Sequence, residues 1–355
     1  MSKFKIGNKY VGKDCSPYFI ADIAANHDGD INRAFNLIEL AKESGADAAK
    51  FQNFKANKIV SKSGFDNIGG KISHQSKWKK SVFEVYEEAS ISYEWTEKLK
   101  NKCNEVNIEY FTSPYDFDSV DKVDRYVNVY KIGSGDITWH EIIEYISSKK
   151  KPVIIATGAS TLEEVKMAMD IITKNTSDVV LMQCNTNYTA NYKNFNHINL
   201  NVIKTYSKIY PNVVLGLSDH TFGHATVLGA IAIGATVFEK HFTDDNERDG
   251  PDHKFSMNPN TWKDMIERSK ELYLSLGSYE KKIEDNELQS SLVQRRILRF
   301  TKDLSKNHVI QKEDVYPLRP MANDGIEPYD IEKIIGKKIK NEVKKDDYIR
   351  WKDLI

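Results

Sequence analysis

Hydrophobic residues recur in two alternating patterns along the first 277 residues of the chain. Short, continuously apolar runs such as 179–182 (VVLM) are followed by longer stretches, such as 31–44, in which apolar residues lie three and four positions apart. The first pattern is typical of strands buried on both faces of a parallel sheet, and the second of amphipathic helices. Gly45 ends the first of these helices, and Asp30 can cap its start.

Eight strand–helix pairs are counted between residues 18 and 277. The strands are expected at 18–23, 46–52, 109–112, 127–132, 153–156, 179–182, 213–217 and 235–238. The helices are expected at 31–44, 94–107, 117–126, 140–147, 162–173, 198–210, 224–233 and 261–276. Eight such units predict a closed (β/α)8 TIM barrel, an α/β fold, with an open doubly wound sheet as the alternative. No GxGxxG follows the first strand, so the sequence does not support a dinucleotide site.

Two segments depart from this alternation. The connection 53–93 is too long for a simple loop, and we expect it to lie over one barrel mouth with a short helix at 78–88. Beyond a barrel domain of residues 1–278, the polar stretch 279–291 is predicted to be a linker. Residues 292–355 are predicted to form a separate small β-rich domain, with strands near 297–301 and 315–318 and a helix at 330–335.

Composition excludes several classes of protein. The 355 residues include 51 Lys and Arg against 51 Asp and Glu, so net charge gives no support for binding nucleic acid or a membrane surface. No apolar run approaches the roughly 20 residues that span a bilayer, and the N-terminus lacks the apolar core of a signal peptide. The three cysteines have no paired spacing, which favours a reduced, cytoplasmic location.

Histidines occupy the ends of two successive strands. Ser218-Asp219-His220 and Glu239-Lys240-His241 follow the runs 213–217 and 235–238. Successive strands of a βαβ unit are parallel, so both tips lie at one sheet edge and the imidazoles can converge on a divalent transition metal. The alternative is two histidines that are satisfied by hydrogen bonds.

Polar residues also end the remaining strands, where TIM barrels place their active sites. Lys50 and Lys131 on separate strands favour an anionic ligand, and Thr112, Ser134 and Ser218 would add hydroxyl donors. Lysines without a metal would instead suggest a Schiff-base aldolase, whereas the histidine pair suggests Lewis-acid activation of a carbonyl. Two other functions remain open: a barrel metal hydrolase, which would need more ligands, and a non-catalytic sugar-binding protein in which the C-terminal domain is the binder.

Several stretches together resemble the sialic acid (N-acetylneuraminate) synthase family. They are IADIAANHDGD, GADAAKFQ, EYFTSPYD, YKIGSGDI, PVIIATGAS, GLSDHT, EKHFT and GPDHKFSMNP. The tail QRRILRFTKDL…PLRP…GIEPYDIEKIIGKK is similar to the family's C-terminal SAF (β-clip, antifreeze-like) domain. The resemblance covers nearly the whole chain.

The resemblance implies condensation of phosphoenolpyruvate with the open-chain aldehyde of an N-acylated amino-sugar. The acceptor would be N-acetylmannosamine or a 2,4-diamino-6-deoxy analogue, and the product a nine-carbon 2-keto-3-deoxy acid plus phosphate. His220 and His241 would hold the metal, which would be Mn²⁺, or else Mg²⁺ or Co²⁺. The residues that would hold phosphoenolpyruvate are Lys50, Thr112, Lys131, Ser134 and Ser218.

The remaining implied roles concern the acids, the sugar and a partner subunit. Asp22 and Asp136 stand where the family usually has glutamates. Asp22 would contact the sugar or the metal's water, and Asp136 would handle water or a proton in the tetrahedral step. Gln52 would line the same mouth as phosphoenolpyruvate. The residues that would contact the sugar are Asn187, Tyr188 and Asp252. Arg296, or the adjacent Arg295, would reach into the partner's barrel and make a domain-swapped homodimer. Ala156 replaces a common serine, which would remove one phosphate hydrogen bond.

Overall fold

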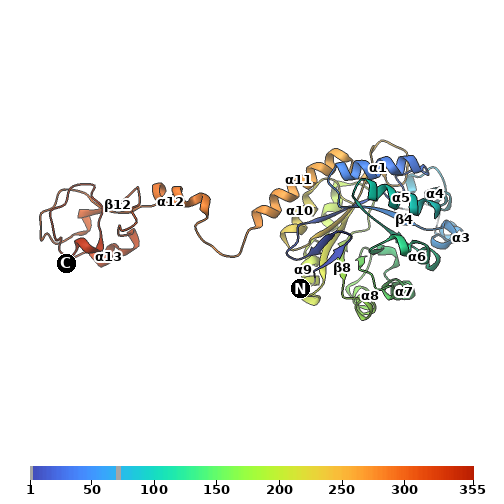
Figure 1. Ribbon diagram of the computed structural model, residues 1–355, viewed down its shortest axis with the longest axis horizontal. Coiled ribbons are helices and arrows are strands. Elements are labelled where there is room, and N and C mark those ends of the chain that lie inside the picture. The colour runs from blue at the N-terminus through green and yellow to red at the C-terminus, as the bar shows by residue number, and fades with distance from the viewer. Residues whose placement is uncertain (1–2, 69–72) are drawn as a thin grey trace. The chain divides into compact units, whose positions relative to one another are not determined.

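The computed structural model describes residues 3–68 and 73–355. It divides into two compact units, Met1–Gly277 and Ser278–Ile355 (Figure 1). Each unit has its own hydrophobic core. Residues 69–72, within the long connection predicted at 53–93, lie outside the described residues. No helix in the described ranges is long and apolar enough to cross a bilayer.

The first unit is a closed barrel of eight parallel strands. The strands are β3 (Tyr18–Asp22), β4 (Ala48–Asn53), β5 (Glu109–Pro114), β6 (Tyr130–Ile132), β7 (Val153–Ala156), β8 (Val179–Cys184), β9 (Val214–Asp219) and β10 (Val237–His241). β10 pairs with both β9 and β3, which closes the sheet and excludes the doubly wound alternative. The predicted TIM barrel is therefore confirmed.

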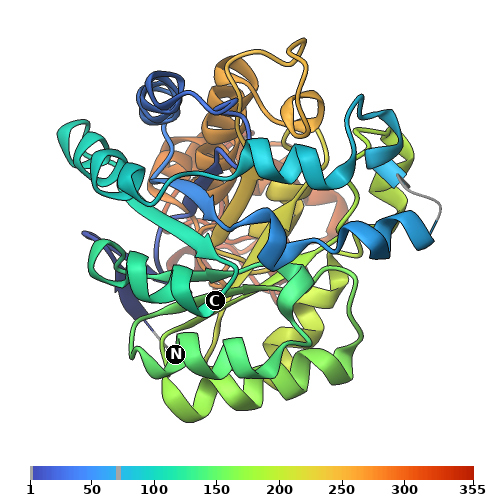
Figure 2. The same ribbon diagram turned by 90° about the vertical axis from the view of Figure 1, so that its right-hand side faces the viewer.

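Helices surround the strands, as Figure 2 shows. They are α1 (Ile31–Glu43), α5 (Glu94–Glu105), α6 (Phe117–Val123), α7 (His140–Ser148), α8 (Leu162–Asn175), α9 (Asn201–Ile209), α10 (Ala225–Ala232) and α11 (Pro259–Leu276). In α1, the side chain of Asp30 accepts a hydrogen bond from the Asn32 amide at the N-terminus, and the apolar face is buried against the barrel. The spacing that predicted these helices therefore marks the face that covers the sheet.

An N-terminal hairpin, which the sequence analysis did not predict, precedes the barrel. Strands β1 (Lys3–Ile6) and β2 (Lys9–Gly12) pair antiparallel around a tight turn at Gly7, whose φ of 57° favours glycine. Phe4, Ile6 and Val11 are buried in the barrel unit's core.

The connection after β4 is built from short helices. They are α2 (Ala56–Ile59), α3 (Lys62–Asn67), the 3₁₀ turn η1 (Ser73–Lys77) and α4 (Val82–Ala89). α4 begins at Ser81, whose side chain forms a capping box with Glu84, so the helix starts later than the predicted residue 78.

The second unit is small and contains the short antiparallel pair β11 (Ile297–Phe300) and β12 (Val315–Leu318), with helix α13 (Ile331–Ile334). Its core comprises Leu298, Phe300, Leu304, Ile310, Val315, Ile326, Ile334, Ile339, Ile349 and Leu354. Residues expected to be a plain linker are partly helical, because η6 (Asp285–Glu287) and α12 (Leu288–Gln294) lie there.

Candidate functional site

Strand register gathers charged side chains inside the C-terminal end of the barrel. Asp22, near the end of β3, is the register partner of both Lys50 on β4 and His241 on β10. Ser218 on β9 is the partner of Glu239 on β10. Because parallel strands end at the same rim, side chains from distant parts of the sequence meet there.

Two lysines and two carboxylates form a buried cluster. Lys50 Nζ lies 2.7 Å from Asp22 Oδ2 and 3.5 Å from Glu239 Oε1, and Lys131 Nζ lies 3.4 Å from the same Glu239 oxygen. The four side chains are between 2% and 6% exposed. Glu239 Oε2 has no hydrogen-bond partner among the described residues. The sequence placed Glu239 at a strand end but gave it no role, and the structure makes it the bridge between the lysines.

The surroundings shift the pKa values of these groups in different directions. Burial acts to lower the pKa of Lys50, but Asp22 and Glu239 outweigh it and raise that pKa. Burial lowers the pKa of Lys131. Burial acts to raise the pKa of Glu239, but Lys131 and Lys50 outweigh it and lower that pKa, whereas burial raises the pKa of Asp22. An anion that reached the lysines would compete with Glu239 for them.

The two strand-end histidines lie side by side. The ring centroids of His220 and His241 are 5.4 Å apart, and Tyr188 and Phe255 pack against both rings. His220 Nδ1 donates to the Asn185 carbonyl at 2.9 Å, the kind of contact that orients metal-bound imidazoles. His241 Nε2 is 3.7 Å from Asp22 Oδ2.

The donor chemistry of this pair fits a divalent transition metal. His241 Nδ1 is buried and has no hydrogen-bond partner among the described residues, so a ring nitrogen is left for another ligand. No group of three or more His, Cys, Asp and Glu suited to a metal occurs in residues 3–68 and 73–355. A metal here would therefore have two imidazoles and would fill its remaining positions with water or substrate, as catalytic sites do.

On β5 the hydroxyl that faces the barrel interior belongs to Ser113, one residue after the predicted Thr112. Gln52 is the register partner of Ser113, so Ser113 shares the face of Lys50 and Gln52, and its hydroxyl is buried without a hydrogen bond in the described structure. Thr112 points to the other face and donates to Asn53 Oδ1 at 2.7 Å. The structure therefore does not bring Thr112 to the lysines, because alternate strand residues face opposite sides.

Ser134 and Ser218 do lie at the rim. Ser134 Oγ accepts from the Gly158 amide at 2.9 Å, and Ser218 Oγ donates to Glu239 Oε1 at 3.5 Å. The buried Thr186 hydroxyl, which the sequence analysis did not single out, has no recorded partner among the described residues and lies against Gly158. Thr186 is therefore a further hydroxyl donor near Ser134. This chain lacks the hydroxyl of the common serine that Ala156 replaces.

Two more acids stand at the mouth with perturbed ionisation. Burial raises the pKa of Asp136, in the 3₁₀ turn η3 (Ser134–Asp136) after β6, to about 6. Burial also raises the pKa of Asp252 to about 6, although this carboxylate accepts a hydrogen bond from the Ala25 amide. Asp252 Oδ2 lies 3.9 Å from His241 Nδ1. Both acids therefore change charge near neutral pH.

Of three other predicted site residues, Gln52 joins the buried cluster, whereas Asn187 and Arg296 are bonded elsewhere. Gln52 Nε2 donates to Asp22 Oδ2 at 3.2 Å, within the cluster. The Asn187 side-chain oxygen accepts from Thr189 and Asn194, so it is engaged in its own loop. Arg296 belongs to the second unit, where it donates to the Pro317 carbonyl at 3.0 Å.

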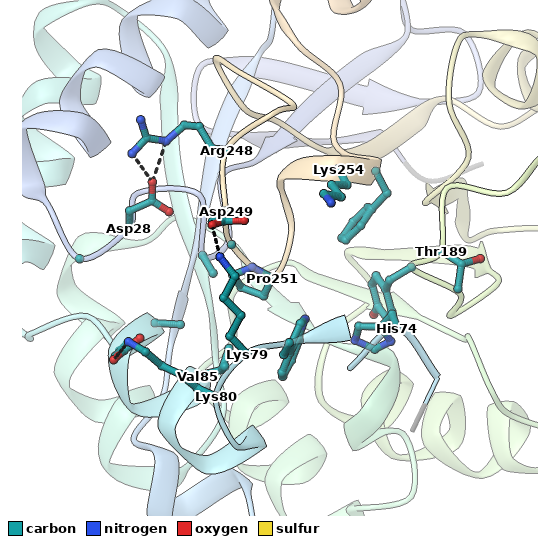
Figure 3. Close-up of a pocket in the computed structure, with 18 residues that line it drawn as sticks. Asp28, His74, Lys79, Lys80, Val85, Thr189, Arg248, Asp249, Pro251 and Lys254 are labelled. Carbon is teal, nitrogen blue, oxygen red and sulfur yellow. Dashed lines mark hydrogen bonds and ion pairs between the residues drawn. The ribbon is translucent and has the colours of Figure 1, made fainter. Parts of the chain in front are cut away.

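A pocket of about 660 Å³ is lined in part by Tyr188 and Phe255, which also pack against the two histidines. Its lining residues are Ala25, Asp28, Gly29, His74, Trp78, Lys79, Lys80, Val85, Glu88, Ala89, Tyr188, Thr189, Arg248, Asp249, Gly250, Pro251, Lys254 and Phe255. Figure 3 shows Arg248 directed at Asp28 and Lys79 at Asp249 across it. The long connection after β4 thus forms one wall of the barrel mouth.

Comparison with known proteins agrees with this architecture. The model of the NeuB family matches residues 37–281, and that of the SAF domain matches residues 295–355. The chain is 35% identical to an N,N'-diacetyllegionaminic acid synthase of Legionella pneumophila over 98% of its own length and 97% of that protein's. It is 32% identical to another of that name from Campylobacter jejuni, over 93% and 98%.

A solved structure is also similar. The N-acetylneuraminic acid (sialic acid) synthetase of Leptospira borgpetersenii superposes with a TM-score of 0.72 at 25% identity, covering 81% of this chain and 95% of that one. The chain therefore belongs to the NeuB family of sialic acid synthases, which are phosphoenolpyruvate-dependent condensing enzymes, and it carries a SAF domain.

Proposed function

We propose that this protein condenses phosphoenolpyruvate with the open-chain aldehyde of an N-acylated amino-sugar to form a nine-carbon 2-keto-3-deoxy acid and phosphate. The observation that carries the proposal is the pair of buried lysines, bridged by Glu239, beside two convergent imidazoles. Buried charges must be paired, and the two lysines share one Glu239 oxygen, so a ligand with anionic groups of its own would pair with both lysines at this barrel mouth.

Phosphoenolpyruvate is the anion. Lys50 and Lys131 bind its phosphate and carboxylate, taking these anionic groups in place of Glu239 as their partners. Ser134 and Ser218 donate further hydrogen bonds. Ser113, whose hydroxyl faces the interior, takes the part expected of Thr112.

His220 and His241 hold the divalent metal, Mn²⁺ by family resemblance. When bound, such an ion supplies Lewis-acid polarisation of a carbonyl oxygen. Asp22, near His241 and hydrogen-bonded by Gln52, orients water or the sugar at this point.

The reaction needs a base that accepts a proton from the water that adds to carbon 2 of phosphoenolpyruvate. Carbon 3 of phosphoenolpyruvate attacks the aldehyde carbon, the aldehyde oxygen takes a proton from solvent, and positive charge develops at carbon 2. Asp136, ionised above its pKa of about 6, stabilises that charge and accepts a proton from the water that adds to carbon 2. The carbon 2 hydroxyl of the tetrahedral adduct then loses its proton as phosphate is expelled, the phosphate carrying that proton away, which leaves the keto group.

The mouth pocket suits an uncharged acceptor with small apolar substituents far from its aldehyde. Three of the pocket's four lysine and arginine side chains are paired with acids: Lys79 with Asp249, Lys80 with Glu88 and Arg248 with Asp28. The fourth, Lys254, has no ion pair among the described residues. Apolar residues also line the pocket, namely Ala25, Trp78, Val85, Ala89 and Pro251. A 2,4-bis(acylamino)-6-deoxy sugar fits this lining better than a sugar phosphate does, and two relatives are named N,N'-diacetyllegionaminic acid synthases.

The test is phosphate release from phosphoenolpyruvate with a panel of acceptors: N-acetylmannosamine, its 6-phosphate and a 2,4-diacetamido-2,4,6-trideoxyhexose. Release that EDTA abolishes and Mn²⁺ restores is expected, fastest with the diacetamido sugar. No release with any acceptor would refute the condensation. Release that is unaffected by EDTA would refute only the metal.

A second subunit completes the site in this proposal. Arg296 reaches the partner's barrel in a domain-swapped homodimer, so Arg296→Ala should lower activity without changing the dimer seen by size-exclusion chromatography. Arg319, exposed in the same unit and without a recorded ionic partner in the described residues, is the comparison variant. Loss of activity with Arg319→Ala alone would move the role to that arginine.

A further inference from the structure

The two strands that carry the histidines are also joined on the face away from the barrel interior. Asp219 precedes His220, Lys240 precedes His241, and Asp219 and Lys240 are register partners on β9 and β10. Lys240 Nζ lies 2.5 Å from Asp219 Oδ2, and their side chains are 2% and 0% exposed. A buried ion pair therefore connects the immediate neighbours of both histidines.

Hydrogen bonds complete this pair. Asp219 Oδ2 also accepts from the hydroxyls of Thr221 at 2.8 Å and Thr226 at 2.6 Å, and Asp219 Oδ1 accepts from the Thr221 amide at 3.1 Å. Lys240 Nζ donates to the Thr221 carbonyl at 2.5 Å. Thr226 lies in the first turn of α10, so strand β9, strand β10 and the covering helix meet at one carboxylate.

This network holds His220 from both sides. The bond from the Thr221 amide to the Asp219 carboxylate spans His220 and closes the short turn at whose centre that histidine lies. Lys240, the residue before His241, is bonded to Asp219 and to Thr221. Sliding of β9 against β10, or opening of the turn, would break buried charged hydrogen bonds, which are among the strongest in proteins.

Stability alone does not account for a charged pair at this place. Buried ion pairs can often be replaced by well-packed apolar residues without loss of stability, whereas their directional bonds fix one arrangement. Here the bonds fix the arrangement of the two histidines.

We propose that Asp219 and Lys240 are positioning residues that set the spacing and orientation of His220 and His241 for a divalent cation. The inference rests on the proposed metal site. Neither residue touches the cation, and both act through the adjacent histidines, as outer partners of metal ligands commonly do.

The experiment compares the wild-type chain with the variant Asp219→Asn/Lys240→Met, which removes both charges together and leaves neither buried alone. Mn²⁺ affinity is measured by isothermal titration calorimetry, and thermal unfolding is measured without metal. The Mn²⁺ Kd is expected to rise about tenfold or more, within the range seen for outer-shell substitutions. The matched control is Lys100→Met, which removes a 3.3 Å ion pair with Glu109. Glu109 is the first residue of β5, at the end of the strand away from the site.

An unchanged Mn²⁺ Kd in the double variant, or a rise no larger than that of Lys100→Met at equal loss of thermal stability, would overturn the proposal. If the double variant does not fold, Thr226→Val removes one donor to Asp219 and keeps the ion pair. It should still weaken Mn²⁺ binding several-fold, and wild-type affinity would overturn the proposal.

A wild-type chain that binds no Mn²⁺ would overturn the positioning role and the metal site together. The phosphoenolpyruvate site is tested separately, by the thermal shift that phosphoenolpyruvate causes in the same metal-free protein.

Discussion

Removing the charge that bridges the two lysines should destabilise the ligand-free protein and increase its response to phosphoenolpyruvate. Glu239→Gln leaves Lys131 without its carboxylate partner and Lys50 with Asp22 alone. At about 3.5 Å and an effective dielectric constant of about 20, each contact is worth roughly 5 kcal/mol before desolvation is counted. Breaking a buried pair in this way typically costs about 3–5 kcal/mol net.

That loss corresponds to a measurable thermal shift. Unfolding of a unit the size of Met1–Gly277 has an entropy of roughly 0.6 kcal/mol/K, so the midpoint should fall by about 5–9 °C. Phosphoenolpyruvate brings its own negative charge to the lysines and should restore much of the loss. Its stabilising shift, measured by calorimetry without acceptor, is therefore expected to be larger in Glu239→Gln than in the wild type.

The matched control is Glu109→Gln, which breaks the pair with Lys100 and is far from the site along β5. It should not change the shift caused by phosphoenolpyruvate. A Glu239→Gln protein as stable as the wild type, or one that responds less to phosphoenolpyruvate, would refute the view that Glu239 occupies the place of the substrate's charge.

Three further predictions concern the same site. His241→Ala should lose Mn²⁺ binding in calorimetry and turnover together, and a variant with full activity would contradict the metal assignment. Because burial raises the pKa of Asp136 to about 6, kcat/KM should fall as the pH drops below about 6, when this carboxylate becomes protonated. Asp136→Asn should be slow and should lack that limb of the profile, and a limb that persists would belong to another acid. Ser113→Ala should raise KM for phosphoenolpyruvate by roughly 10- to 150-fold, since hydrogen bonds to charged groups are worth about 1.5–3 kcal/mol. Thr112→Val should lower stability and leave that KM unchanged.

The barrel could be predicted from sequence because each strand is short and apolar and each helix has a distinct apolar face. Because the strands are apolar throughout, their sequences do not indicate which residues face the barrel interior. A parallel strand is buried on both faces, so Thr112 and Ser113 look equivalent in the sequence. Only their pairing with β4 separates the hydroxyl bonded to Asn53 from the one facing the lysines.

Other features were missed for different physical reasons. The hairpin β1–β2 could have been predicted, because polar and apolar residues alternate along Lys3–Ile6 before Gly7-Asn8, a pair typical of hairpin turns. Helix α12 buries none of its residues, and Leu288 and Leu292 remain exposed, so it lacks the buried face by which a helix is recognised. Glu239 was visible at a strand end, but its bridging role depends on lysines from two distant strands.

The depth of the lysines has a kinetic consequence. Lys50 and Lys131 are each 2% exposed, whereas the mouth pocket lined in part by Tyr188 and Phe255 is open to solvent along its charged rim. In the proposed reaction, an acceptor seated in that pocket lies nearer to solvent than the three-carbon substrate, so an acceptor that bound first would obstruct entry of the three-carbon substrate. Addition should therefore be compulsory-ordered, with the three-carbon substrate first, and an excess of the sugar should cause substrate inhibition that more of the three-carbon substrate relieves.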